Sequence, residues 1–99
     1  MKPRVLSEKE IKKGGFMPAS VRRAGTLLVK EAYRTNRHIA YEVADPVSGS
    51  RHIVIYESEK RPPLDWTCDC EWYSTKTVKN GKYCAHILAV LFYLNKVLL

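Results

Sequence analysis

Two closely spaced pairs of side chains in this chain have the chemistry of a metal site. Cys68 and Cys70 are separated by one residue, and after thirteen further residues Cys84 and His86 repeat that spacing. Zn²⁺ favours tetrahedral coordination by thiolate and imidazole groups, so these four side chains would fill the shell of one ion. A filled shell leaves no position for water or substrate, so the pattern predicts one structural zinc ion. The alternative, three buried thiols and an unrelated core histidine, does not explain the two pairs.

The residues around these pairs resemble the SWIM zinc finger family. Residues 66–72 read WTCDCEW, and residues 83–91 read YCAHILAVL, in which C-x-H opens an apolar helix. The resemblance extends over about residues 51–95 and implies that the two pairs bind zinc. SWIM modules occur in chromatin-remodelling ATPases, transposase-related proteins, recombination-accessory proteins and ubiquitin ligases, where they contact DNA or proteins. None of those larger domains fits in the rest of this chain, so only the module's own role is expected.

The composition predicts a small, basic domain. The 99 residues include 17 Lys and Arg against 10 Asp and Glu, which gives a formal net charge of +7. A chain of this length buries only a small core, and a bound zinc ion can add to its stability. Three thiolates with one Zn²⁺ lower the total charge only to about +6. The excess of positive charge favours a polyanionic partner such as nucleic acid. Solubility alone is the alternative explanation.

The cysteine count and the absence of long apolar segments indicate an intracellular protein. Three cysteines cannot all pair within one chain, and their spacing suits a metal in a reducing compartment. Residues 1–4 begin no apolar segment of the kind that a secretion signal requires. The longest apolar run, residues 87–94, is far shorter than the roughly 20 residues that cross a bilayer. We therefore expect a cytoplasmic protein, or a nuclear one if the cell is eukaryotic, with no membrane contact.

The pattern along the chain predicts an arm followed by one domain. Residues 1–15 are charged and predict a basic arm that is flexible or ordered by a partner, with a short helix at 8–13 that a Ser-x-x-Glu capping box begins. Residues 16–99 form the single SWIM-like domain, whose zinc core spans residues 66–98. A second short helix is expected over residues 18–25, because proline begins it and glycine follows it.

The remaining elements predict an α+β fold. Runs rich in Val, Ile and Tyr at residues 27–33, 38–43 and 51–57 are joined by short connections, which favours a three-stranded antiparallel meander. An Asn-Gly pair between the ligand pairs is typical of a small hairpin in the zinc loop. Residues 84–98 repeat apolar side chains every three or four positions and predict a C-terminal helix. Its further apolar residues, Leu88 among them, need a cover from the N-terminal helices or from a partner protein.

Several basic and aromatic residues are candidates for contact with nucleic acid. Loop lysines between the ligand pairs rank first, then arginines at the first hairpin, then two arginines that could instead complement a helix dipole. Two aromatic residues near the lysines could stack on a base, although packing is the favoured explanation for them. Trp66 is expected to pack around the metal, and His38 and His52 to lie on the sheet surface. The candidates are Lys76, Lys79, Lys82, Arg34, Arg37, Arg22, Arg23, Trp72 and Tyr73.

Two functions fit these features, and the residues do not distinguish DNA from RNA. The first is a nucleic-acid-binding module that contacts the phosphates of DNA or of structured RNA such as ribosomal RNA, with little sequence specificity. The second is a protein–protein adaptor in a recombination, chromatin or ribonucleoprotein assembly, which would use the surface of the C-terminal helix. An enzyme is not expected, because the sequence offers no nucleophile–base set and no glycine-rich phosphate loop for a small-molecule substrate.

Overall fold

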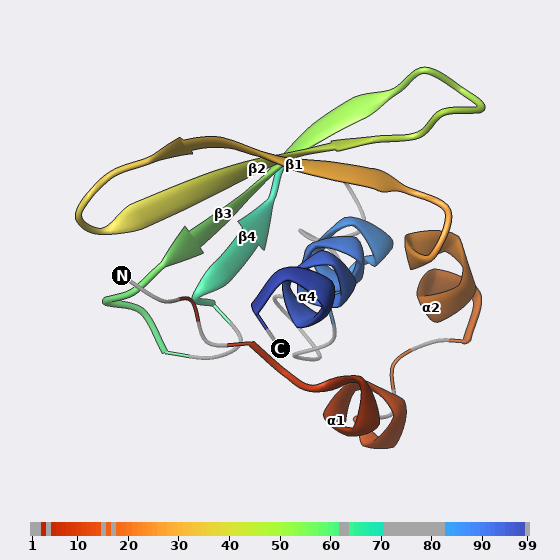
Figure 1. Ribbon diagram of the computed structural model, residues 1–99, viewed down its shortest axis with the longest axis horizontal. Helices are drawn as coiled ribbons and strands as arrows, with labels where there is room; N and C mark the ends of the chain where they lie inside the picture. Colours follow the sequence, from red (N-terminus) through yellow and green to blue (C-terminus); the bar gives the residue numbers. More distant parts are fainter. Residues whose placement is uncertain are drawn as a thin grey trace.

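An antiparallel sheet of four strands forms one layer of the domain, and the helices lie on one of its faces (Figure 1). The computed structural model describes residues 3, 5–14, 16, 18–61, 64–70 and 83–98. Each strand pairs with its neighbour in the sequence, in the order β1-β2-β3-β4. The strands are β1 (Leu28–Arg34), β2 (His38–Ala44), β3 (Arg51–Glu57) and β4 (Trp66–Cys68).

The alternation of apolar residues in β2 determines which face of the sheet is buried. Ile39, Tyr41 and Val43 are each at most 1% exposed, as the period of two predicts. The same alternation continues in β3, where Val54 and Tyr56 are buried. The predicted α+β fold is therefore confirmed, and its three predicted strands are present.

The fourth strand, β4, was not predicted. It has only three residues, and it pairs antiparallel with β3 through the partners Val54 and Cys68, Ile55 and Thr67, and Tyr56 and Trp66. A run this short carries no recognisable period, so only the neighbouring strand reveals it. Its consequence is functional, because β4 attaches the first cysteine pair to the edge of the sheet.

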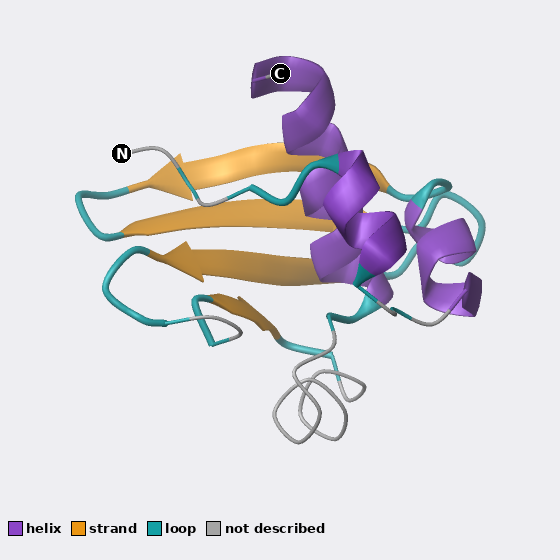
Figure 2. Ribbon diagram, turned by 90° about the horizontal axis from the view of Figure 1, so that it is seen from below, coloured by secondary structure: helices purple, strands orange, loops and turns teal. Residues whose placement is uncertain are grey.

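Three helices complete the described fold. The C-terminal helix α4 (Ala85–Leu98) crosses the buried face of the sheet, as Figure 2 shows. The helix α2 (Pro18–Ala24) packs beside α4, and α1 (Glu8–Lys13) lies on the side of α4 away from the sheet (Figure 1). Leu88 is fully buried in this arrangement. Of the further apolar residues of α4, Leu88 is thus covered within the chain. Among the described residues, no helix has the length and apolar character needed to cross a bilayer.

The described part of residues 1–15 contacts the domain. Ser7 and Glu10 form the predicted capping box, which begins α1. Ile11 is 1% exposed and belongs to the core, and the side-chain amide of Asn95 donates a hydrogen bond of 2.8 Å to the carbonyl oxygen of Leu6. The division of the chain into an arm and a domain stays a prediction. In the structure, however, this segment supplies part of the cover over α4.

We expect Tyr41→Phe to reduce the loss of stability at alkaline pH. The Tyr41 hydroxyl is buried without a hydrogen-bond partner among the described residues, and burial raises the pKa of Tyr41 to about 12, with a smaller contribution from the charge of Glu31. Between about pH 10 and the higher folded-state value, the unfolded tyrosine ionises while the folded one does not, so stability is lost as pH rises. Denaturation midpoints from pH 8 to 11 test this against Tyr33→Phe, whose ring is exposed. Equal pH dependence in both variants would contradict it.

Candidate metal centre

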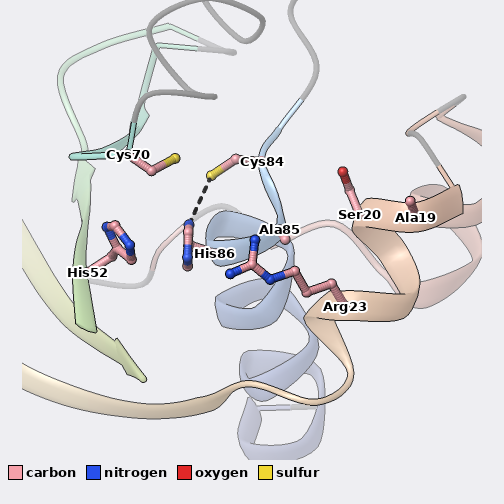
Figure 3. Close-up of a pocket in the computed structure, with 8 residues that line it drawn as sticks. All are labelled: Ala19, Ser20, Arg23, His52, Cys70, Cys84, Ala85 and His86. Atoms are coloured by element: carbon pink, nitrogen blue, oxygen red, sulfur yellow. Dashed lines mark hydrogen bonds between the residues drawn. The ribbon is translucent and has the colours of Figure 1, made fainter. Parts of the chain in front are cut away.

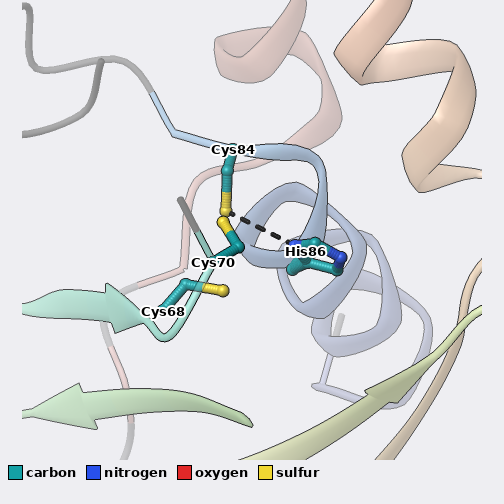
Figure 4. Close-up of side chains that lie close together, drawn as sticks. All are labelled: Cys68, Cys70, Cys84 and His86. Atoms are coloured by element: carbon teal, nitrogen blue, oxygen red, sulfur yellow. Dashed lines mark hydrogen bonds between the residues drawn. The ribbon is translucent and has the colours of Figure 1, made fainter. Parts of the chain in front are cut away.

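The four predicted ligands converge at the junction between β4 and α4. Cys68 is the last residue of β4, and Cys70 follows it in the next turn of chain. Cys84 directly precedes α4, and His86 lies in the first turn of that helix. One ligand atom from each residue lies within 4.8 Å of all the others, which forms a group able to hold a metal ion (Figure 4). The sheet therefore contributes one pair and the helix contributes the other.

Cys84 is placed at the positive end of the α4 dipole. The backbone carbonyl of Cys84 accepts the first helical hydrogen bond from Leu88 N at 3.0 Å. The backbone N–H of Ile87 donates to the Cys84 sulfur and lowers the pKa of that thiol. The unpaired N–H groups of a helix N-terminus favour an adjacent negative charge. The helix end thus favours the thiolate, the form of cysteine that binds metal, while Cys70 and burial act in the opposite direction.

Without a cation, the buried sulfur atoms favour the protonated thiol form. The three cysteines are buried and form no disulfide. Hydrogen bonds with Cys70 and Cys84, together with burial, raise the pKa of Cys68 well above its usual range. For Cys84, the lowering by a hydrogen bond with Cys68 is outweighed by Cys70 and burial, which bring its pKa to about 12. The thiolates that bind metal would therefore need the positive charge of the ion itself, which would replace the thiol protons.

The orientation of His86 also fits a ligand. Its Nδ1 lies 4.0 Å from the Cys84 sulfur, so this nitrogen faces the cysteine cluster (Figure 4). Its Nε2 is buried and has no hydrogen-bond partner among the described residues. An imidazole that binds metal through Nδ1 keeps its proton on Nε2. The four residues therefore fit one tetrahedral zinc ion, which would link the sheet to the helix and supply no reactive position.

A cavity of about 370 Å³ opens beside the cysteine and histidine side chains. Cys70, Cys84 and His86 form one wall, and Ser20 and Arg23 of α2 form the opposite wall (Figure 3). His52 of β3 closes one side. Small molecules such as chelators can therefore approach three of the four candidate ligands from this side.

The candidate nucleic-acid contacts fall into three groups: residues that are not described, arginines with an acidic partner, and one arginine for which the described residues provide no such partner. Lys76, Lys79, Lys82, Trp72 and Tyr73 lie outside the described residues.

The hairpin arginines and Arg23 already have acidic partners. Arg34 contacts Glu31 at 2.7 Å and Arg37 contacts Glu59 at 3.4 Å, while Arg23 contacts Asp45 at 3.6 Å. Arg22 is exposed, and the described residues provide no ion-pair partner for it. Of the four described candidates, Arg22 is the one most available to a phosphate.

The structure places His52 differently from the prediction. It was expected on the sheet surface, but its side chain is only 29% exposed and it lies next to the candidate metal ligand His86. His52 precedes Val54 and Tyr56 by two and four residues, and these share the buried face of β3. That alternation could have shown from the sequence that His52 lies on the buried face of β3. His38 differs, because it makes an ordinary contact of 3.8 Å with Glu57.

Comparison with known families agrees with this geometry. Residues 55–95 match the family model of the SWIM zinc finger. This segment of the chain is therefore similar to a SWIM zinc finger. The matched segment includes both ligand pairs and ends within α4, and Trp66 packs in its core at 1% exposure, as predicted. Neither the curated proteins nor the solved structures include a significant match to the chain.

Proposed function

We propose that the SWIM zinc finger holds one structural zinc ion and that the domain binds nucleic acid through phosphate groups. The convergence of Cys68, Cys70, Cys84 and His86 supports the zinc ion. The net charge of +7 supports the polyanionic partner. Because protein side chains would fill the metal shell, we propose binding rather than catalysis. Thiolate ligands are stable in a reducing compartment, so we place this function inside the cell.

The distribution of ion pairs supports an interface on the helical side of the molecule. On the sheet, Glu42 contacts both Lys30 and Arg51, at 3.7 and 3.3 Å, so these cations are partly neutralised. The helices carry cations for which the described residues provide no ion-pair partner. These are Lys9 and Lys13 of α1, Arg22 of α2 and Lys96 of α4.

A salt titration tests the proposed binding mode. Binding to phosphates releases counterions, so affinity should fall steeply as salt rises, with a slope of about −0.9 per duplex phosphate contacted. The triple variant Lys13→Gln, Arg22→Gln, Lys96→Gln should weaken binding to all sequences alike and make the slope shallower by about one for each lost contact. Fluorescence anisotropy with single-stranded DNA, duplex DNA and structured RNA measures both effects and identifies the preferred ligand.

A matched control removes cations that are paired within the structure. The double variant Arg34→Gln, Arg37→Gln changes charge on the first hairpin, where both arginines have carboxylate partners. It should weaken binding less than the helical triple variant does. If the zinc-loaded protein binds none of the three ligands at low salt, nucleic-acid binding is wrong.

A protein adaptor is the second candidate, and one surface feature favours it. A groove of about 250 Å³ runs between the start of β1 and α4, and its lining includes Leu28, Phe92 and Tyr93. Leu28 is 62% exposed, and Val97 at the end of α4 is 59% exposed. Leu88 is buried and cannot take part. Binding through this groove would depend only weakly on salt, which separates it from phosphate binding.

A further inference from the structure

The residue between the first two cysteines is anchored to β3. The Asp69 carboxylate oxygen Oδ1 accepts a hydrogen bond of 3.3 Å from the backbone N–H of Ile53. The Asp69 backbone N–H donates to the Ile53 carbonyl oxygen at 3.4 Å. Because Asp69 lies between Cys68 and Cys70, these two bonds constrain the chain that carries both sulfur atoms.

The same carboxylate oxygen also contacts His52, which in turn contacts the second ligand pair. The distance from Asp69 Oδ1 to His52 Nδ1 is 2.9 Å. The centre of the His52 ring lies 4.2 Å from the centre of the His86 ring, with 39° between the two planes. Figure 3 shows these two rings facing each other across one side of the cavity. A continuous set of contacts therefore runs from the C-x-C turn, through β3, to the helix ligand.

We propose that His52 and Asp69 are positioning residues that hold both ligand pairs in the geometry that zinc requires. Asp69 restrains the C-x-C turn, and His52 restrains the ring of His86, so one unit acts on ligands that are distant in sequence. Groups that orient metal ligands commonly change metal affinity by about 10- to 100-fold when they are removed. His52 lies outside the matched residues 55–95, whereas Asp69 lies within them.

The hydrogen bond also determines the proton position on His52. A carboxylate only accepts hydrogen bonds, so the Nδ1 of His52 must carry the proton that it shares with Asp69. In the unaltered, zinc-loaded protein, His52 should therefore carry its proton on Nδ1. The positioning role of His52 and Asp69 depends on the proposed zinc ion but not on the proposed binding of nucleic acid.

Zinc affinity and the rate of zinc transfer to a chromogenic chelator test the proposal. His52→Ala and Asp69→Ala should each lower zinc affinity by about 10-fold or more, and the double variant should lose little further affinity because the two residues act together. Asp69→Asn retains an accepting oxygen and should recover most of the affinity. His38→Ala is the matched control, because it removes a strand histidine whose partner is Glu57 and should leave zinc affinity unchanged.

Two outcomes would overturn the proposal. If His52→Ala and Asp69→Ala bind zinc as tightly as His38→Ala does, neither residue positions the ligands. Additive losses in the double variant would show that they do not act as a unit. If a variant fails to fold, long-range ¹H–¹⁵N NMR of the unaltered protein tests the hydrogen bond between His52 and Asp69 directly. A His52 ring without a proton on Nδ1 would contradict that hydrogen bond and with it the proposal. A protein that never binds zinc would instead contradict the proposed function.

Discussion

Removal of zinc is expected to unfold the part of the domain that surrounds the metal. Structural zinc contributes about 10 kcal/mol or more of apparent binding free energy near neutral pH, which is comparable with the whole stability of a small domain. Here the ion would join β4 to the start of α4, whose residues Ile87, Leu88, Val90 and Leu91 are fully buried in the core. Chelation should therefore abolish the cooperative melting transition and reduce the helical circular dichroism signal. Cys84→Ser should do the same and lower the zinc content.

Two controls separate the loss of metal from other effects. A reducing agent without a chelator should leave the spectrum unchanged, because the three cysteines form no disulfide. Addition of zinc to the chelated protein should restore the transition. A protein that is fully folded after chelation, with an unchanged melting temperature, would contradict the assignment of a structural zinc ion.

Trp66→Ala is expected to cause the largest loss of stability from a single core substitution, about 3–5 kcal/mol. Trp66 is 1% exposed, and its ring lies 4.9 Å from that of Tyr56 and 6.1 Å from that of Tyr41, between ring centres. The small β4 strand depends on this packing, and Cys68 follows two residues later. Because metal binding and folding are coupled, the substitution should also lower the apparent zinc affinity. Urea denaturation of the zinc-loaded protein and chelator competition measure the two effects.

The control for this substitution is Val47→Ala. Val47 is 94% exposed in the turn between β2 and β3, so its truncation should change stability by less than about 0.5 kcal/mol. Trp66→Phe retains part of the buried ring, so its loss of stability should lie between those of Trp66→Ala and Val47→Ala. If Trp66→Ala shifts the urea midpoint no more than Val47→Ala does, then β4 is not held by its core packing.

The sequence alone determined the local elements and the identity of the candidate ligands. The capping box at Ser7 begins α1, the alternation of Ile39, Tyr41 and Val43 marks the buried face of β2, and the apolar repeat after Cys84 defines α4. Each of these signals depends on residues that are close in sequence, because helix and strand periods are local properties. The spacing within each ligand pair is local in the same sense, and together with the apolar helix after Cys84 it was sufficient to predict the resemblance to the SWIM zinc finger.

Only the tertiary structure decided how these elements act together. The strand β4 exists because β3 supplies its hydrogen bonds, since three residues have no period of their own. The availability of each arginine depends on a carboxylate elsewhere in space, such as Asp45 for Arg23. The contact between His52 and His86 joins positions that are distant in sequence, and no local pattern encodes it. Which further side chains surround the four candidate ligands depends on packing between layers, because packing brings together residues that are distant in sequence.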